Sequence, residues 1–252
     1  MPASPSNGRR AYLVTGAGSG IGLAIAGRLA DDGHDVLAVD RQPAADGPGR
    51  PFQADLTRRE DNAAAVDETL AAFDRLDGVI ACAGFQHVAP IDSFPEDTWD
   101  AMLAVMLTSP FLLARRAWPA LRASGDGRFV AIASVHALRA SAYKSAYASA
   151  KHGVLGLVKT LALEGAPHGI TATAICPGYV RTPLVEQQIA AQAEAHGIPA
   201  GDVVEHVLLA RQARRRLIEP AEVAATVAFL LGDGGRAFTG APVVMDNGWT
   251  SS

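Results

Sequence analysis

The sequence predicts a single α/β domain, a doubly wound parallel sheet of about seven strands with helices on both faces. Three observations point to this fold class. Short apolar runs alternate with longer helical patterns from end to end, which is the order of a parallel sheet. A glycine-rich turn joins the first apolar run to the first helical pattern. The chain has 252 residues, 49% hydrophobic and 19% charged, which suits one large core and argues against disorder.

Seven apolar runs are the expected strands, at residues 12–14, 36–39, 52–54, 78–81, 129–133, 170–175 and 243–245. Short apolar strands between helices are typical of a sheet that is buried on both faces. Crossovers between parallel strands are right-handed, and ligands of such sheets gather at the carboxyl ends of the strands. We therefore expect the functional residues to follow these strands directly.

Helical patterns fill the intervals, at residues 21–30, 62–73, 96–122, 146–164 and 220–231. Pro220 suits the first turn of the last helix, whereas Pro110 and Pro119 should bend or divide the third. Residues 182–216 form one longer excursion, polar and alanine-rich, which we expect to be helical and to act as a substrate lid. No linker splits the chain, and residues 1–10, rich in Pro, Ser and Gly, are expected to be a mobile tail.

Charge and composition exclude several classes of protein. The formal net charge is -4, so no global basic field favours nucleic acid, and the three arginines at 214–216 suit a solvated helix face better than a phosphate or substrate contact. Cys82 and Cys176 lack metal-ligand spacing, so we predict no metal site and interpret both as small buried residues in a reducing compartment. No apolar run reaches the about 18 residues of a membrane span, and no export signal follows Arg9 and Arg10. We expect a cytoplasmic protein without a membrane partner.

The glycine-rich turn predicts a dinucleotide site formed by Gly16, Ser19, Gly20, Ile21 and Gly22. Glycine lets the backbone pass close to a pyrophosphate, and a helix N-terminus supplies free amides and a positive dipole. Such a stretch is weak evidence by itself, because ordinary turns also use glycine. Its place between a strand and a helix makes it specific.

Acidic residues after the second and third strands refine the cofactor. Asp40 lies about twenty residues beyond the turn, where a carboxylate accepts hydrogen bonds from the adenosine ribose and repels a 2′-phosphate. This favours NAD over NADP, although the adjacent Arg41 can soften the preference. Asp55 and Leu56 should lie near the adenine edge, and the alternative for this pair is an ordinary strand-end turn.

Ser134, Tyr147 and Lys151 are the expected catalytic residues. Tyrosine is a poor base at neutral pH because its unperturbed pKa is about 10. Lys151 follows Tyr147 by four residues, so the two share a helix face, and an ammonium there should lower the tyrosine pKa. The Ser134 hydroxyl can donate a hydrogen bond to an oxygen that Tyr147 protonates or deprotonates. The dinucleotide turn and the tuned tyrosine together predict hydride transfer coupled to proton transfer, the chemistry of a nicotinamide dehydrogenase.

Together with Cys176-Pro177-Gly178, these motifs resemble the short-chain dehydrogenase/reductase family over nearly the whole chain. The resemblance implies a Rossmann-like fold with Tyr147 as acid/base, Ser134 orienting the substrate oxygen and Lys151 holding the nicotinamide ribose. It also implies that further cofactor contacts come from Ala83, Gly84, Pro177, Gly178, Val180 and Thr182, the last of these at the carboxamide.

Other segments resemble the bacterial D-3-hydroxybutyrate dehydrogenases within that family, namely residues 85–91, 133–136, 144, 182–189 and 248–250. This resemblance implies that the substrate carboxylate is bound by Gln86, His136, Lys144 and Gln188, with Trp249 packed nearby. A four-carbon hydroxy acid offers little apolar area, so its anion must supply recognition. Lys144 lies three residues before Tyr147, and on a helical first turn both side chains project toward the same side.

Plainer explanations exist for several of these residues. His136 follows Ser134 by two, so on an extended strand end both side chains point the same way, but a single histidine is often structural. His87 points away from Gln86 in an extended segment, and we expect it to be structural. Lys144 could instead be a solvated cation, and Gln188 lies within the excursion.

Four positions depart from the family pattern. Met106 stands where the family carries an asparagine that helps to hold a water between the catalytic lysine and solvent, and a thioether is at best a weak acceptor. Ala81 and Cys82 stand where two asparagines are common, and Tyr179 replaces a tryptophan that is usual in the hydroxybutyrate subgroup. We expect an active enzyme with an altered proton path.

The resemblance thus implies NAD-dependent interconversion of (R)-3-hydroxybutyrate and acetoacetate. One alternative is another small hydroxy acid or secondary alcohol on the same machinery, and another is a nucleotide-binding regulator with impaired catalysis. The resemblance also implies a homotetramer assembled through helices 96–122 and 146–164 and the C-terminal strand. Both helices carry apolar residues on more than one face.

Overall fold

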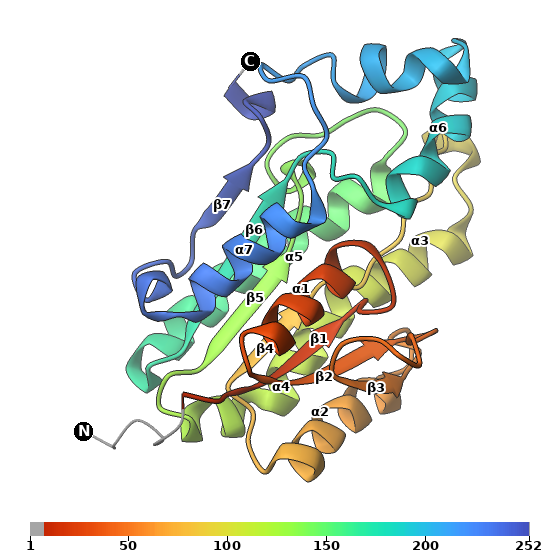
Figure 1. Cartoon of the computed structure of the whole chain (residues 1–252). Helices are drawn as coiled ribbons and strands as arrows, with labels where there is room; N and C mark the ends of the chain where they lie inside the picture. The colour runs from red at the N-terminus through yellow and green to blue at the C-terminus, as the bar shows by residue number, and fades with distance from the viewer. Residues whose placement is uncertain (1–7, 252) are drawn as a thin grey trace.

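Seven strands form one parallel sheet in the order β3-β2-β1-β4-β5-β6-β7 (Figure 1). The structure is a computed structural model and describes residues 8–251. The strands are β1 (Ala11–Thr15), β2 (Asp35–Asp40), β3 (Arg50–Gln53), β4 (Gly78–Ala81), β5 (Arg128–Ile132), β6 (Thr171–Pro177) and β7 (Pro242–Met245). The chain moves from β1 outward to β3, returns to β4 and continues to β7, so the strand order reverses between β1 and β4. The predicted fold class is confirmed.

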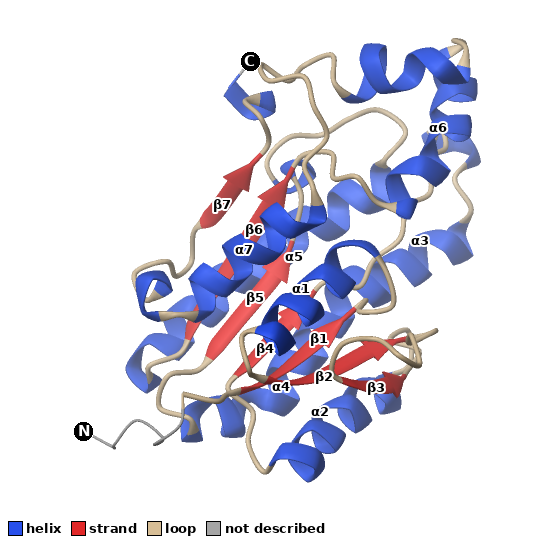
Figure 2. Cartoon of the chain, in the orientation of Figure 1, coloured by secondary structure: helices blue, strands red, loops and turns tan. Residues whose placement is uncertain are grey.

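Helices cover both faces of the sheet (Figure 2). They are α1 (Gly20–Asp31), α2 (Arg59–Phe73), α3 (Glu96–Leu103), α4 (Ser109–Ala123), α5 (Ser145–Gly165), α6 (Pro183–His196) and α7 (Pro220–Leu231). Alternate residues of a strand point to opposite faces, and β1 shows this directly. Tyr12 and Val14 pack with Ile25 of α1 and Val227 of α7, whereas Leu13 belongs to the core under α2, α4 and α5.

The long helical stretch before β5 is divided once. Between α3 and α4 the chain makes one wider π-helical turn, Ala104–Thr108, and Pro110 falls in the first turn of α4. Proline has no amide N–H, and in the first turn of a helix that N–H would have no helical partner in any case. The helix is therefore interrupted just before Pro110, as predicted. Pro119, by contrast, lies inside α4 without ending it. It is exposed, and so is Arg115, whose carbonyl loses its helical partner and can face water.

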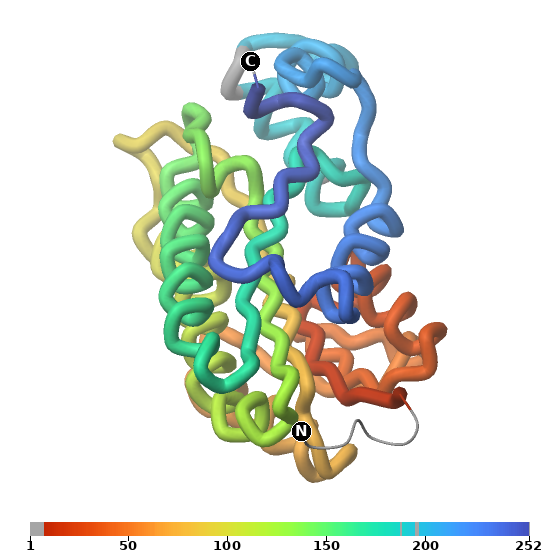
Figure 3. Tube along the Cα trace, turned by 90° about the vertical axis from the view of Figure 1, so that its left-hand side faces the viewer, coloured from red at the N-terminus to blue at the C-terminus, as the bar shows by residue number. Residues whose placement is uncertain are grey.

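Residues 182–216 lie above the carboxyl ends of the strands. The excursion begins with α6, continues through two short helical turns, Ala200–Asp202 and Val204–Leu208, and packs on a small apolar cluster of its own. The C-terminal segment lies beside it (Figure 3), and Asn247 donates hydrogen bonds to Gln212 and to the Arg216 carbonyl. The expected helical character is found.

The N-terminal residues 1–7, part of the expected mobile tail, lie outside the described residues. Arg9 and Arg10, which we also counted in that tail, form ion pairs with Asp35 and Asp126, the second at 2.8 Å. The packed chain therefore begins before β1. No helix within residues 8–251 is long and apolar enough to cross a membrane.

Candidate active site

Two cavities lie side by side at the carboxyl edge of the sheet and share Ile21, Thr182 and Leu184 in their walls. The glycine-turn cavity, of about 550 Å³, lies at the point where the strand order reverses. The tyrosine cavity, of about 70 Å³, contains Ser134 and Tyr147. Open parallel sheets bind ligands at such a reversal, so the position agrees with the sequence-based expectation.

Most of the predicted cofactor residues line the glycine-turn cavity: Gly16, Ser19, Gly20, Ile21, Gly22, Asp40, Asp55, Leu56, Ala83, Gly84 and Thr182. Pro177, Gly178, Val180 and Tyr147 line the tyrosine cavity instead, again with Thr182 in the shared wall. Lys151 lines neither cavity and is buried. The two predicted groups of residues are thus brought to adjacent spaces.

Close backbone approach explains the glycines of the turn. Gly16 has φ +69, and a Cβ there would stand 2.9 Å from the Cα of Ala83. The Thr15 hydroxyl accepts hydrogen bonds from the amides of Cys82 and Ala83 at 3.0 and 3.1 Å, which holds the end of β4 against the turn. The sequence analysis missed this role of Thr15. A hydroxyl on the last residue of the first strand, directly before the glycines, is the signal that could have found it.

Asp40 is fixed by main-chain amides. Its carboxylate accepts hydrogen bonds from the amides of Gly18 and Gln42, both at 2.9 Å. A carboxylate has about four acceptor positions, so capacity remains for a hydroxyl in the cavity. Asp55 is held similarly by Thr57, whose hydroxyl and amide lower the pKa of the Asp55 carboxyl. Both acids present fixed negative charge to the cavity, which Arg41 and Thr57 also line.

The structure brings Ser134, Tyr147 and Lys151 together. Ser134 follows β5, while Tyr147 and Lys151 lie one turn apart at the start of α5. The Lys151 ammonium lies 5.5 Å from the centroid of the Tyr147 ring and donates to the Ile132 carbonyl at 2.7 Å. The arrangement can exchange a proton between a phenol and a substrate oxygen beside a hydroxyl donor.

The expected lowering of the Tyr147 pKa is not found. Burial raises the pKa of Tyr147 to about 12, and the contact with the Ser134 hydroxyl opposes this only in part. Burial also lowers the pKa of Lys151 to about 8. The Lys151 ammonium, which donates to the Ile132 carbonyl, is not among the groups that shift the Tyr147 pKa. Tyr147 therefore holds its proton at neutral pH in this structure.

His136 lines the tyrosine cavity, but not through extended backbone. It lies in a short 3-10 turn, Val135–Ala137, and its own amide donates a hydrogen bond to the Ser134 hydroxyl, which caps the turn. Its Nδ1 lies 3.2 Å from the Ser134 hydroxyl and its Nε2 lies 3.0 Å from the Ser141 hydroxyl. Burial lowers the pKa of His136 to about 3, so the imidazole is neutral. The buried Trp249 ring packs at 5.7 Å from it, close to the site as predicted.

Lys144 is buried, with 3% of its surface exposed, which rules out a solvated cation. Its ammonium donates a hydrogen bond to the Tyr179 hydroxyl at 3.3 Å, and burial lowers its pKa to about 8. Gln188 lines the same cavity, with its side-chain amide donating to the Leu184 carbonyl at 2.9 Å. Tyr179 was noted in the sequence only as a departure, and the structure makes it the partner of Lys144.

Gln86, like Trp249, is a predicted substrate residue that does not line the tyrosine cavity. Its side-chain nitrogen is buried and has no hydrogen-bond partner among residues 8–251. The adjacent His87 packs edge-on against Phe94 at 5.2 Å, which fits the structural role we expected for it.

Met106 is buried in the wider turn between α3 and α4. A Cβ added at Gly84 would stand 3.1 Å from the Met106 sulfur and 3.9 Å from the Lys151 amine. The thioether and the Lys151 amine therefore both lie close to the place that a Gly84 side chain would occupy. An apolar group occupies a position where the family carries an amide.

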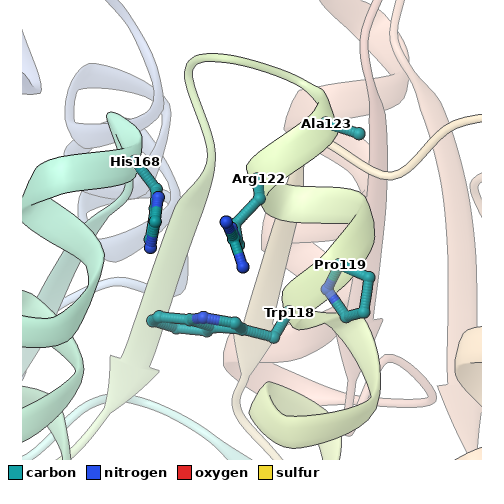
Figure 4. A pocket seen from close by; sticks show the side chains of 5 residues that line it. All are labelled: Trp118, Pro119, Arg122, Ala123 and His168. Atoms are coloured by element: carbon teal, nitrogen blue, oxygen red, sulfur yellow. The ribbon is translucent and has the colours of Figure 1, made fainter.

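A further depression of about 490 Å³ lies near the amino ends of β5 and β6, at the far end of the sheet from both cavities. Arg122 and His168 lie side by side there above the ring of Trp118 (Figure 4). It contains neither the glycine turn nor the tyrosine, so the candidate active site is at the opposite edge.

Comparisons with known proteins show what this chain is similar to as a whole. A family model described as enoyl-(acyl carrier protein) reductase matches residues 16–250. The chain is 40% identical over 256 residues to the uncharacterized oxidoreductase YxjF of Bacillus subtilis, covering 96% of this chain and 99% of that protein. It is 40% identical over 252 residues to a D-beta-hydroxybutyrate dehydrogenase of Rhizobium meliloti, covering 95% and 98%. The solved structure of Thermoplasma acidophilum aldohexose dehydrogenase matches with a TM-score of 0.89 and 29% identity, covering 97% of this chain and 95% of that one.

Proposed function

The chain belongs to the short-chain dehydrogenase/reductase family, and from that premise we propose that it interconverts (R)-3-hydroxybutyrate and acetoacetate with NAD. Family membership, which the motifs predicted, is confirmed, so the chain is an oxidoreductase. The observation that supports this substrate is one small cavity, which is lined by the hydroxyls of Ser134 and Tyr147 and by the buried ammonium of Lys144. A compact hydroxy acid needs a proton donor at one end and a cation at the other.

The family and the sheet topology imply a nicotinamide cofactor, and the glycine-turn cavity fits one. A Cβ at Gly22 would stand 2.1 Å from the Gly16 carbonyl oxygen, so the backbone cradle depends on missing side chains. When bound, the cofactor exchanges a hydride with the carbinol carbon. We propose NAD because the fixed carboxylate of Asp40 lines this cavity. There it would accept hydrogen bonds from the ribose hydroxyls of NAD and repel the 2′-phosphate of NADP.

Tyr147 carries the proton in this proposal. In acetoacetate reduction the protonated phenol donates to the carbonyl oxygen, and in the reverse direction the phenolate takes the carbinol proton. The Ser134 hydroxyl donates a hydrogen bond to the same oxygen and orients it. Lys151, one helical turn away, supplies an amine beside the Tyr147 ring and would hold the ribose of the cofactor.

Lys144 and Gln188 would bind the substrate carboxylate. The ammonium is the buried positive charge of the tyrosine cavity, and an ion pair there would satisfy a group that now has a single long hydrogen bond. His136 is neutral, so its imidazole would form a hydrogen bond with the substrate but no ion pair. Trp249 packs against the His136 ring.

An initial-rate assay of NADH formation tests the proposal. We expect turnover of (R)-3-hydroxybutyrate with NAD, little with the (S) form, and a preference for NAD over NADP. Lys144→Ala should raise the KM for 3-hydroxybutyrate by about tenfold or more, whereas turnover of the neutral 2-butanol should change little. Equal losses on both substrates would favour a neutral alcohol as substrate. NAD binding without any NADH formation would favour a regulator.

We also propose that α6 and the following residues to 216 act as a substrate lid, because α6 contributes Gln188 to the tyrosine cavity. Assembly into a homotetramer is supported by large apolar side chains exposed on α4, α5, α7 and β7, such as Phe111, Leu163, Phe229 and Val244. The free cysteines Cys82 and Cys176 suit the reducing cytoplasm.

A further inference from the structure

A third cavity, which we call the distal cavity, borders the tyrosine cavity and has a volume of about 460 Å³. Lys144 and Tyr179 line both cavities and form the wall between them. The other side chains with polar groups in its lining are Ser141, Gln192, His206, Arg211 and Trp249. The proposed four-carbon substrate leaves this space without a role.

Lys144 and Tyr179, the two residues of this wall, are held together only weakly. The hydrogen bond from the Lys144 ammonium to the Tyr179 hydroxyl is 3.3 Å long, beyond the usual range, and the ammonium lies 5.1 Å from the centroid of the Tyr179 ring. Among residues 8–251, no carboxylate forms an ion pair with Lys144. A buried ammonium without a counter-ion is costly unless an anion joins it, and its four-carbon stem allows it to follow that anion.

Gln192 is a second buried polar group with open hydrogen-bonding capacity. It is 3% exposed, lines the distal cavity, and its side-chain amide forms no hydrogen bond with any residue in the described part of the chain. It lies four residues after Gln188 on α6, so the two side chains start from one helix face with their Cβ atoms about 6 Å apart. One amide therefore lies in the tyrosine cavity and the next in the distal cavity, with Lys144 lining both.

The charges around the distal cavity favour an anion. No acidic residue is found in its described lining, whereas the exposed His206 and Arg211 both lie in its wall. The Arg211 guanidinium is stacked 4.6 Å above the centroid of the Trp249 ring. A guanidinium at a cavity wall raises the local concentration of anionic ligands, and the His206 ring adds a hydrogen-bonding group.

We propose that the distal cavity is a second carboxylate site, which admits oxo acids and hydroxy acids whose carboxylate lies roughly three to five carbons farther from the reacting carbon than in acetoacetate. The inference rests on the proposed function, because it takes the reacting carbon to lie at Tyr147. The longer acid arm passes between Lys144 and Tyr179. The Gln192 amide then donates to its carboxylate, and the Lys144 ammonium turns to pair with it.

Methyl ketones test this without a stereochemical variable. Reduction by NADH is compared for acetoacetate, for 7-oxooctanoate, whose acid arm is longer by about four methylene groups, and for the neutral 2-octanone. We expect kcat/KM for 7-oxooctanoate to exceed that for 2-octanone by about tenfold or more. Gln192→Glu keeps the side-chain shape and repels a carboxylate, so the ratio of kcat/KM for 7-oxooctanoate to that for acetoacetate should fall by about tenfold. Gln192→Leu should lower the same ratio by less.

The outcomes separate the two proposals. If acetoacetate is reduced but 7-oxooctanoate is reduced no better than 2-octanone, the second carboxylate site is overturned and the proposed function stands. The same conclusion follows if neither variant changes the ratio of kcat/KM for 7-oxooctanoate to that for acetoacetate. The opposite outcome is that the protein prefers 7-oxooctanoate to 2-octanone, loses this preference in Gln192→Glu, and does not reduce acetoacetate. That outcome would overturn the proposed substrate and keep the second carboxylate site. Thermal unfolding of each variant measures its folding, and Gln192→Leu decides the matter if Gln192→Glu does not fold.

Discussion

The Lys151 ammonium donates a 2.7 Å hydrogen bond to the main-chain carbonyl of Ile132 at the end of β5. This contact ties the catalytic helix α5 to the sheet one turn beyond Tyr147. It also keeps the amine beside the tyrosine ring, 5.5 Å from its centroid, while the phenol is left in a buried environment that raises its pKa to about 12. The spacing of the two residues on one helix face thus brings them together, and the hydrogen bond to the strand carbonyl fixes the position of the amine.

Tyr147 should be among the last tyrosines to ionise in the protein without added nucleotide. Its pKa is raised, so the phenol stays protonated through neutral pH and ionises only as the pH approaches about 12. An ultraviolet difference titration of wild type against Tyr147→Phe measures this, and the absorbance lost in the variant should belong to the high-pH part of the curve. Ionisation of Tyr147 below its ordinary value of about 10 would contradict the expectation. The same variant should lose about 10²–10⁴-fold in turnover, whereas Tyr12→Phe, far from the site, should not.

Replacing Lys144 by methionine should stabilise the protein and abolish its preference for acids. The folded-state pKa of Lys144 is lowered from 10.5 to about 8, so the unfolded chain binds more protons between these two values. Burial of the ammonium is therefore penalised fully below about pH 8, and the penalty fades as pH rises toward 10.5. At pH 7 we expect Lys144→Met to raise the free energy of unfolding by about 1–3 kcal/mol, measured with urea.

The control for that experiment is Lys159→Met, on the exposed side of α5. An exposed lysine has no desolvation penalty, so this change should leave the stability within about 0.5 kcal/mol. A similar gain for both variants, or a gain for Lys144→Met that persists at high pH, would show that lost burial cost is not the cause.

Asp40→Ala should exchange the cofactor preference. Loss of the carboxylate removes both the acceptor for ribose hydroxyls and the repulsion of a 2′-phosphate, so kcat/KM should fall with NAD by about tenfold or more and rise with NADP. Asp55→Ala is the matched control, since Asp55 lines the same cavity at a different strand end and should lower both values together. An unchanged ratio of the two cofactors in Asp40→Ala would remove Asp40 from the specificity argument.

Met106→Asn should raise the rate under conditions where proton release limits it. Met106 fills the space beside Gly84, next to the Lys151 amine, and an amide there could hold a water that the thioether cannot. Burying an amide should also cost about 1–3 kcal/mol of stability. Met102→Asn, at a fully buried position of the same cluster, should carry a similar cost without any gain in rate. Equal pH–rate profiles for Met106→Asn and wild type would mean that the protein uses another proton route.

Gly16→Ala should weaken both cofactor binding and stability. The residue has φ +69, and an added Cβ would stand 2.9 Å from the Ala83 Cα, so the turn or the end of β4 must shift. We expect a loss of about 1–3 kcal/mol in stability and a raised Kd for NAD, measured by thermal unfolding and calorimetry. Gly156→Ala on α5 meets nothing within 4 Å and should instead gain up to about 1 kcal/mol.

Much of the fold follows from local pattern. Each predicted strand lies within two residues of the observed one at both ends, because apolar runs between helices mark buried parallel strands regardless of their partners. The wider turn between α3 and α4 could be expected from Pro110, whose missing donor restricts the local backbone. The unbroken helix around Pro119 could not, because it depends on which face of α4 meets solvent.

The sequence by itself determined the order of strands and helices, the glycine turn, and the neighbourhood of Tyr147 and Lys151, because each depends on residues within a few positions of one another. Only the tertiary structure decided that His136 lies in a capped 3-10 turn and that Lys144 is buried against Tyr179. It also decided that Gln86 does not line the tyrosine cavity and that burial raises the pKa of Tyr147. Contacts such as Lys144 with Tyr179 join distant parts of the chain. The burial that sets a pKa comes from every element packed around the group, and no local spacing encodes that sum.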